Sequence, residues 1–64
     1  MIDLNEFLAF IRNDYGIYIR IRGEKISTGL DQFIKDHPTD WELFDVDYIR
    51  PSYNDLIIVV HKYF

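Results

Sequence analysis

Residues 55–64 read DLIIVVHKYF, and this stretch decides how the chain folds. Its five consecutive apolar residues, 56–60, include four that are β-branched. Such a run, preceded by turn-forming residues at 52–55, is typical of a strand that is buried on both faces. We therefore expect it at the centre of a sheet, with both faces covered by the chain, or with a partner molecule covering one of them.

The length of 64 residues predicts one domain, spanning residues 1–64. A domain of this size buries only about 60% of the surface that its unfolded chain exposes, so self-association would add useful stability. With 48% hydrophobic and 17% aromatic residues, the chain is too apolar to be disordered.

The chain has no cysteine, which excludes disulfide bonds and cysteine-based zinc sites. No basic segment followed by an apolar run begins the chain, and its longest apolar run is far shorter than a membrane span. We expect a cytoplasmic protein with no membrane contact.

Residues 4–14 are predicted to form a helix, with Asp3 as its N-cap and Glu6 as the capping-box partner. Phe10 is expected to widen the apolar stripe, and Gly16 to adopt the left-handed conformation that follows a helix end. The stripe has the helical spacing i, i+3, i+4, i+7 and consists of Leu4, Phe7, Leu8 and Ile11.

Residues 17–22 alternate between isoleucine and polar or aromatic side chains, which predicts a strand. Gly23 and Glu24 suit a two-residue type II′ hairpin loop, followed by a short edge strand at 25–27.

This loop would set Ile21 opposite Ile26 and Arg22 opposite Lys25. Because facing like charges repel, either the hairpin end is splayed or an anion or acidic neighbour lies beside it.

A second helix is predicted from the Thr28-x-x-Asp31 capping pattern to about Asp36, where Pro38 biases His37 out of the helical region. Its apolar stripe consists of Leu30, Phe33 and Ile34.

Residues 43–50 are predicted to form a strand that ends at Pro51, with a loop at 51–54. The alternation changes phase after Leu43, so we expect a bulge or short turn there, with Trp41 inside the protein. Phe44, Val46 and Tyr48 would then face the core, and Asp45, Asp47 and Ile49 would face outward.

These elements predict an α+β fold, a small four-stranded, mainly antiparallel sheet with two helices in the order α-β-β-α-β-β. Residues 55–64 would form the central strand. The first helix would pack on one face of the sheet and the second at an edge or end.

The formal net charge of −4 is concentrated between residues 31 and 55. Net acidity disfavours general binding to phosphate backbones and is compatible with a basic protein partner. The acidic residues of this segment are candidates for a partner-binding face: Asp31, Asp36, Asp40, Glu42, Asp45, Asp47 and Asp55.

The histidines, His37 and His61, lack the spacing of a metal-binding motif, and we predict no metal and no cofactor. Asp45 and Asp47 would lie about 7 Å apart along a strand, a separation at which carboxylates can perform acid-base chemistry. A solvated strand face explains them better, and the next alternative is a pairing of His61 with one of them. We expect no enzyme and no small-molecule substrate.

A second candidate partner-binding face combines tyrosine with basic residues around the first hairpin and the late loops. An ordinary exposed strand face, with arginine stems covering a tyrosine ring, would explain the same residues. Tyrosine is enriched among the residues that dominate binding energy at protein interfaces. The candidates are Tyr18, Arg20, Arg22, Lys25, Tyr53 and Tyr63.

The main hypothesis is a small non-enzymatic protein-binding module, either an inhibitor or regulator of a larger protein or a self-associating domain. An alternative is an acidic mimic of nucleic acid that blocks a basic nucleic-acid-handling protein. Small phage anti-restriction and anti-CRISPR inhibitors act in this way, and the likeness is one of size and charge only. Further alternatives are a weak nucleic-acid binder using Tyr18, Arg20 and Arg22, and a small hydrolase using Asp45, Asp47 and His61.

Overall fold

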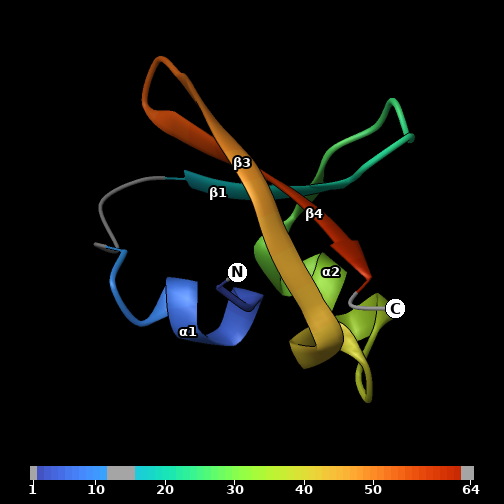
Figure 1. Cartoon of the computed structure of the whole chain (residues 1–64). Helices are drawn as coiled ribbons and strands as arrows, with labels where there is room; N and C mark the ends of the chain where they lie inside the picture. The colour runs from blue at the N-terminus through green and yellow to red at the C-terminus, as the bar shows by residue number, and fades with distance from the viewer. Residues whose placement is uncertain (1, 12–15, 63–64) are drawn as a thin grey trace.

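The central position in the sheet belongs to β4 (Asp55–Lys62), as predicted. In the computed structural model, which describes residues 2–11 and 16–62, the strand order is β2-β1-β4-β3 (Figure 1). β1 (Gly16–Ile21) runs parallel to β4, and β3 (Phe44–Ser52) runs antiparallel to it on the other side. β2 (Thr28–Gly29) pairs antiparallel with β1 at the edge. The predicted α+β class and mainly antiparallel sheet are confirmed, with β1 and β4 as a parallel pair.

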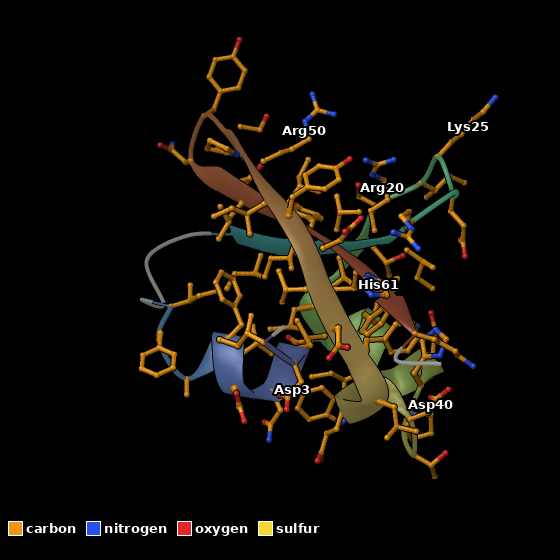
Figure 2. The ribbon with its side chains drawn as sticks, viewed as in Figure 1. Asp3, Arg20, Lys25, Asp40, Arg50 and His61 are labelled. Atoms are coloured by element: carbon orange, nitrogen blue, oxygen red, sulfur yellow. The ribbon has the colours of Figure 1, made fainter. Side chains whose placement is uncertain are left out.

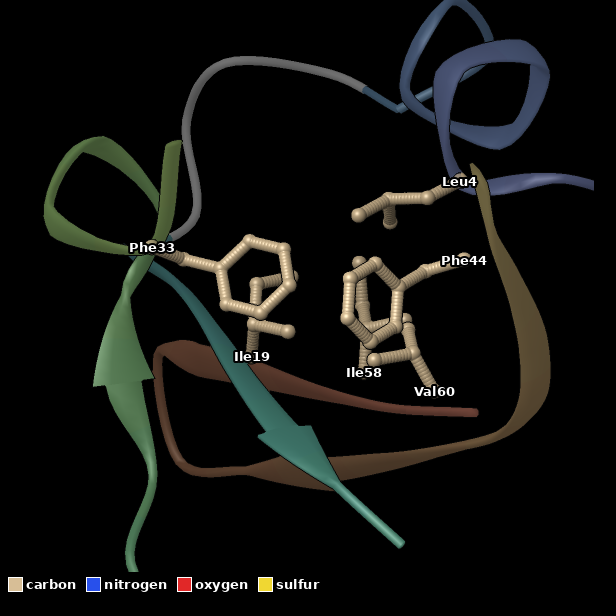
Figure 3. Packing of buried hydrophobic residues seen from close by; sticks show 6 residues of the cluster. All are labelled: Leu4, Ile19, Phe33, Phe44, Ile58 and Val60. Carbon is tan, nitrogen blue, oxygen red and sulfur yellow. The ribbon is translucent and has the colours of Figure 1, made fainter. Parts of the chain in front are cut away.

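Both helices, α1 (Leu4–Leu8) and α2 (Leu30–Asp36), lie on the same face of the sheet (Figure 1). The core fills the space between this helix layer and the sheet (Figure 3). In the described part of the chain, no helix or strand covers the opposite face. The buried core cluster consists of Leu4, Ile19, Phe33, Phe44, Ile58 and Val60.

The apolar run of β4 is buried on both faces over its second half, at Ile58, Val59 and Val60, whereas Leu56 and Ile57 are half-buried, so the predicted burial is confirmed only in part. Ile58 and Val60 belong to the core cluster on the helix side, whereas Val59 points to the opposite face and is only 1% exposed. No helix lies on that side, and Val59 is covered instead by polar and aromatic side chains of the neighbouring strands.

The first helix begins where predicted and ends six residues earlier than predicted. The backbone N–H of Glu6 donates a 2.7 Å hydrogen bond to the Asp3 carboxylate, which confirms the N-cap. The N–H groups of Ala9 and Phe10 bond to carbonyls three residues back, so the helix tightens and ends. A helix this short is held by its packing, and Phe10 is exposed rather than part of the stripe.

Gly16 is the first residue of β1 and not a helix cap, which corrects the prediction. Its N–H donates to the Asn54 carbonyl at 3.3 Å, which joins the start of β1 to the β3–β4 turn. The predicted end of the helix, at residues 12–14, lies outside the described residues.

The predicted register of the first hairpin is correct, but the paired part is shorter and lies further from the turn. Tyr18 pairs with Gly29 and Ile19 with Thr28, in the alignment that would also set Ile21 opposite Ile26. The two arms separate beyond Ile19, so the second strand is Thr28–Gly29 instead of 25–27. Ile26 is exposed, and the predicted contact with Ile21 is wrong.

Both predicted possibilities for the hairpin end are found: its arms are splayed, which separates Arg22 from Lys25, and an acidic residue lies beside Arg22. Arg22 instead pairs with Asp47 on β3. The turn also differs from the predicted type II′ loop. The Glu24 N–H donates to the Ile21 carbonyl at 2.9 Å, and Gly23, with φ of 93°, is the third residue of this turn, where type II turns require glycine.

The second helix ends at Asp36 as predicted, but its predicted capping box is absent. The N-cap residue is Gly29, which has no side chain that could cap the helix, whereas Thr28, the predicted cap, lies one residue earlier in β2. Trp41 begins the short 3₁₀ helix η1 (Trp41–Leu43), which supplies the short turn expected before β3. The Trp41 side chain is half-buried against the core.

β3 contains a bulge at Asp47, between Val46 and Tyr48, where none was predicted. After the bulge Tyr48 lies opposite Val59, away from the helices, and Ile49 lies opposite Ile58 on the core side. The predicted facing of Tyr48 and Ile49 is therefore wrong, since a bulge shifts every later residue to the other face.

The same strand continues through Pro51 to Ser52 and does not end at the proline. Proline is tolerated because β3 is an edge strand and, in the described chain, no strand lies beside its outer side at Pro51. The connection to β4 is thus a two-residue turn, Tyr53-Asn54, and not the predicted longer loop.

Candidate functional site

The face of the sheet opposite the helices, here called the open face, carries aromatic and basic side chains that no helix or strand of the described chain covers. Arg20 and Arg50 lie on this side of the sheet, whereas Asp3 and Asp40 lie on the helix side (Figure 2). By alternation and strand register, its exposed or half-buried members include Tyr18, Arg20, Arg22, Tyr48, Arg50 and Ile57.

The centre of the open face is a hydrogen bond between β1 and β3 that passes over β4. The Arg20 guanidinium donates to the Tyr48 hydroxyl at 3.0 Å and to the Glu24 carbonyl at 3.1 Å. Val59 on the intervening strand is level with both residues in the register. The Arg20–Tyr48 pair therefore covers Val59 and explains its burial on a face without a helix.

A second cross-strand contact lies further along β4. The Arg22 guanidinium is 3.6 Å from one Asp47 oxygen, and His61 Nδ1 is 4.0 Å from the other. The Asp47 bulge brings its carboxylate between these two groups. Of the two carboxylates predicted to pair with His61, Asp47 is the one that forms this contact.

Asp45 is buried, with 4% of its surface exposed, and does not lie on a solvated strand face as predicted. It faces His61 in the register, and both Asp45 Oδ2 and His61 Nδ1 are buried without a hydrogen-bond partner among the described residues. The chain start lies beside it, since Asp3 bridges to Asp45 and the Val46 N–H donates to the Ile2 carbonyl at 3.0 Å. This adjacent segment could not be foreseen from local alternation.

The acidic residues singled out from the sequence do not form one face. Four of them belong to the helix side, in α2 and η1 or at the η1 N-cap, and three belong to the open face. On the helix side Asp40 pairs with His37 at 3.4 Å and with Lys62 at 3.5 Å. The first group is Asp31, Asp36, Asp40 and Glu42, and the second is Asp45, Asp47 and Asp55.

The tyrosine and arginine residues of the sequence prediction are brought together only in part. Tyr18, Arg20 and Arg22 share the open face. Lys25 lies in the splayed loop and Tyr53 at the tip of the β3–β4 turn. Tyr63 lies outside the described residues.

Sequence reasoning missed Tyr48, Arg50 and Ile57 as members of this face. If β3 had no bulge, Tyr48 and Arg50 would lie on the same face as the core residue Phe44, because alternate residues of a strand share a face. An arginine at a core-facing position was the available signal that the alternation changes phase before it.

The described residues offer no group of three or more metal-ligating side chains. An open hollow between β1 and α2 has neither histidine in its lining, which consists of Gly16, Ile17, Tyr18, Gly29, Leu30, Asp31, Gln32 and Lys35. The longest helix of the described part, α2, has seven residues, so none is long enough to cross a membrane.

Comparisons of the chain with protein-family models, with curated proteins and with solved structures found no match. The arrangement of side chains on the open face is therefore the basis for assigning a function.

Proposed function

We propose that the domain is a non-catalytic protein-binding module, acting as an inhibitor or regulator of a larger protein, and that its contact surface is the open face. The observation that carries this proposal is the exposure of two tyrosines, Tyr18 and Tyr48, at 39% and 46%, on a sheet face without a covering element. A solvated face needs only polar side chains, whereas tyrosine and arginine are the residues that dominate binding energy at protein interfaces.

The geometry of the face also favours binding because part of it is already ordered. Arg20 is held by two hydrogen bonds and Arg22 by the Asp47 carboxylate. Side chains that are fixed before binding lose less conformational entropy in a complex. This leaves Arg50, exposed and without an ion pair in the described part of the chain, as the cation most available to a partner's carboxylate.

A protein partner agrees with the charges better than nucleic acid does. The three arginines of the open face are matched by three carboxylates, Asp45, Asp47 and Asp55. Affinity for a phosphate backbone requires an excess of positive charge. The division of the acidic residues between two sides of the sheet likewise gives little support to mimicry of a phosphate array, which needs its charges on one surface.

The test is affinity capture from an extract of the source cells with immobilised wild-type domain and matched variants. Tyr18→Ser and Arg50→Glu alter exposed side chains of the open face that make no hydrogen bond or ion pair with the rest of the described chain. The matched control is Asp31→Asn with Glu42→Gln, which changes exposed groups on the helix side. Circular dichroism establishes that each variant is folded.

We expect a protein that the wild type and the helix-side control retain and that both open-face variants lose by at least about tenfold, the effect of about 1.4 kcal/mol. If the open-face variants retain the captured protein and the control loses it, the contact lies on the acidic helix side, which would support mimicry. Equal retention by all variants would refute both surfaces.

A further inference from the structure

The β3–β4 hairpin ends in the two-residue turn Tyr53-Asn54, which points away from the helix layer (Figure 1). The Tyr53 side chain is fully exposed, with a relative accessibility of 102%. No hydrogen bond, ion pair or ring contact links it to the rest of the described chain. Its ring therefore contributes nothing to the packing of the domain.

The backbone of Tyr53 is in the left-handed region, with φ of 54°, and it is the only described residue other than glycine with a positive φ. Tight hairpin turns that match the twist of a sheet require this conformation, and glycine, asparagine and aspartate supply it with little strain. For a bulky residue the same conformation is an outlier that local sterics disfavour. Tyrosine is thus a poor choice for the turn itself.

We infer that Tyr53 is an anchor residue that enters an apolar pocket on the protein partner. Residues held in strained conformations are concentrated at functional contacts, and an isolated exposed tyrosine combines a large apolar ring with a polar hydroxyl. This inference rests on the proposed function, because it places the anchor at the end of the open face.

The occupant of this contact is a protein surface with a pocket for a phenol ring and a carboxylate near its rim. The carboxylate is inferred from Arg50, which precedes Tyr53 by three residues on the same hairpin and is exposed. A nucleobase stacking on the ring is the alternative that the experiment must separate, because every base also offers an apolar face.

The first arm of the experiment needs no partner. Tyr53→Gly and Tyr53→Asn should raise the melting temperature by about 4 °C, because they remove left-handed strain and no contact. Tyr53→Phe keeps the strain and should leave the melting temperature unchanged. A fall in the melting temperature of both Tyr53→Gly and Tyr53→Asn would show that the ring supports the fold and would overturn the inference.

The second arm is photo-crosslinking in the source cells with a benzophenone-bearing phenylalanine analogue in place of Tyr53. The same analogue replaces Tyr18, on the open face, and Asp31, on the helix side, as reference positions. We expect a protein adduct from position 53 and from position 18, and none from position 31. The crosslinked partner peptide should contain apolar residues from a pocket.

The outcomes separate the two proposals. A protein adduct from position 18 but not from position 53 would keep the open face as the contact and overturn the anchor. Absence of a protein adduct from both positions would overturn the proposed function and the anchor with it. An adduct with nucleic acid at position 53 would overturn the protein pocket.

Discussion

Arg20 and Tyr48 are hydrogen-bonded across β4 at 3.0 Å, although neither strand that carries them pairs with the other. The pair acts as a polar cover over Val59, a task that a second helix layer performs in other folds. At Val59 the domain thereby buries the second face of its central strand, although its helices form a single layer.

Loss of the Tyr48 hydroxyl should weaken this cover. We expect Tyr48→Phe to lower the free energy of unfolding by about 1 kcal/mol, the net value of a hydrogen bond in proteins. The measurement is urea denaturation followed by circular dichroism. Tyr18→Phe is the control, since the Tyr18 hydroxyl makes no hydrogen bond with the described part of the chain, and it should change stability by less than about 0.5 kcal/mol. Equal effects of the two substitutions would contradict the role of the bond.

Asp45 should be a destabilising residue. Its Oδ2 is buried and has no hydrogen-bond partner in residues 2–11 and 16–62, and such a group carries an uncompensated desolvation penalty. We expect Asp45→Val, which suits a strand, to raise the free energy of unfolding by about 1–3 kcal/mol.

Asp47→Asn is the comparison for Asp45→Val. It removes the charge of a more accessible carboxylate and should cost no more than about 1 kcal/mol. If Asp45→Val lowers stability instead, the buried carboxylate has a stabilising role that its missing hydrogen bond does not suggest. Both are measured by thermal and urea unfolding.

The N-cap of α1 offers a third test. Asp3→Ala removes the acceptor of the Glu6 N–H and should lower the free energy of unfolding by about 1 kcal/mol. Asp3→Asn retains an acceptor oxygen and should retain most of the stability. An identical loss in both variants would indicate that the negative charge, rather than the hydrogen bond, stabilises the helix.

Gly23 and Gly29 provide a matched pair of glycines for a test of backbone conformation. An added Cβ would have nothing within 4 Å at either position, so steric contact is not a variable. Gly23 has φ of 93°, and Gly23→Ala should cost about 1–2 kcal/mol.

Gly29 has φ of −57° at a helix N-cap. Replacing it by alanine reduces the conformational entropy of the unfolded chain, which stabilises the fold, but it also removes a residue that N-cap positions prefer, which destabilises it. Gly29→Ala should therefore change stability by less than about 0.5 kcal/mol. Chemical unfolding of both variants makes the comparison, and similar losses at the two sites would refute the conformational explanation.

The predictions that succeeded rested on interactions between residues close in the chain or on a long apolar run. The Asp3 cap, the end of the second helix and the central place of β4 are of this kind. Among the predictions that failed, those that changed the candidate site concerned the phase of β3, where one bulge at Asp47 moved Tyr48 out of the core. The candidate site was therefore found in part, through Tyr18, Arg20 and Arg22, and missed where β3 contributes to it.

The residues in order were enough to establish an α+β chain with its most apolar strand inside, because burial of β-branched side chains leaves a central strand few alternatives. They could not establish which side chains meet across β4, since Arg20 and Tyr48 are 28 positions apart and join only after the strands are aligned. The burial of Asp45 and the fully exposed, left-handed Tyr53 likewise result from the folded arrangement. Register, bulges and turn geometry depend on contacts between distant segments, and those contacts decided which surface is left for a partner.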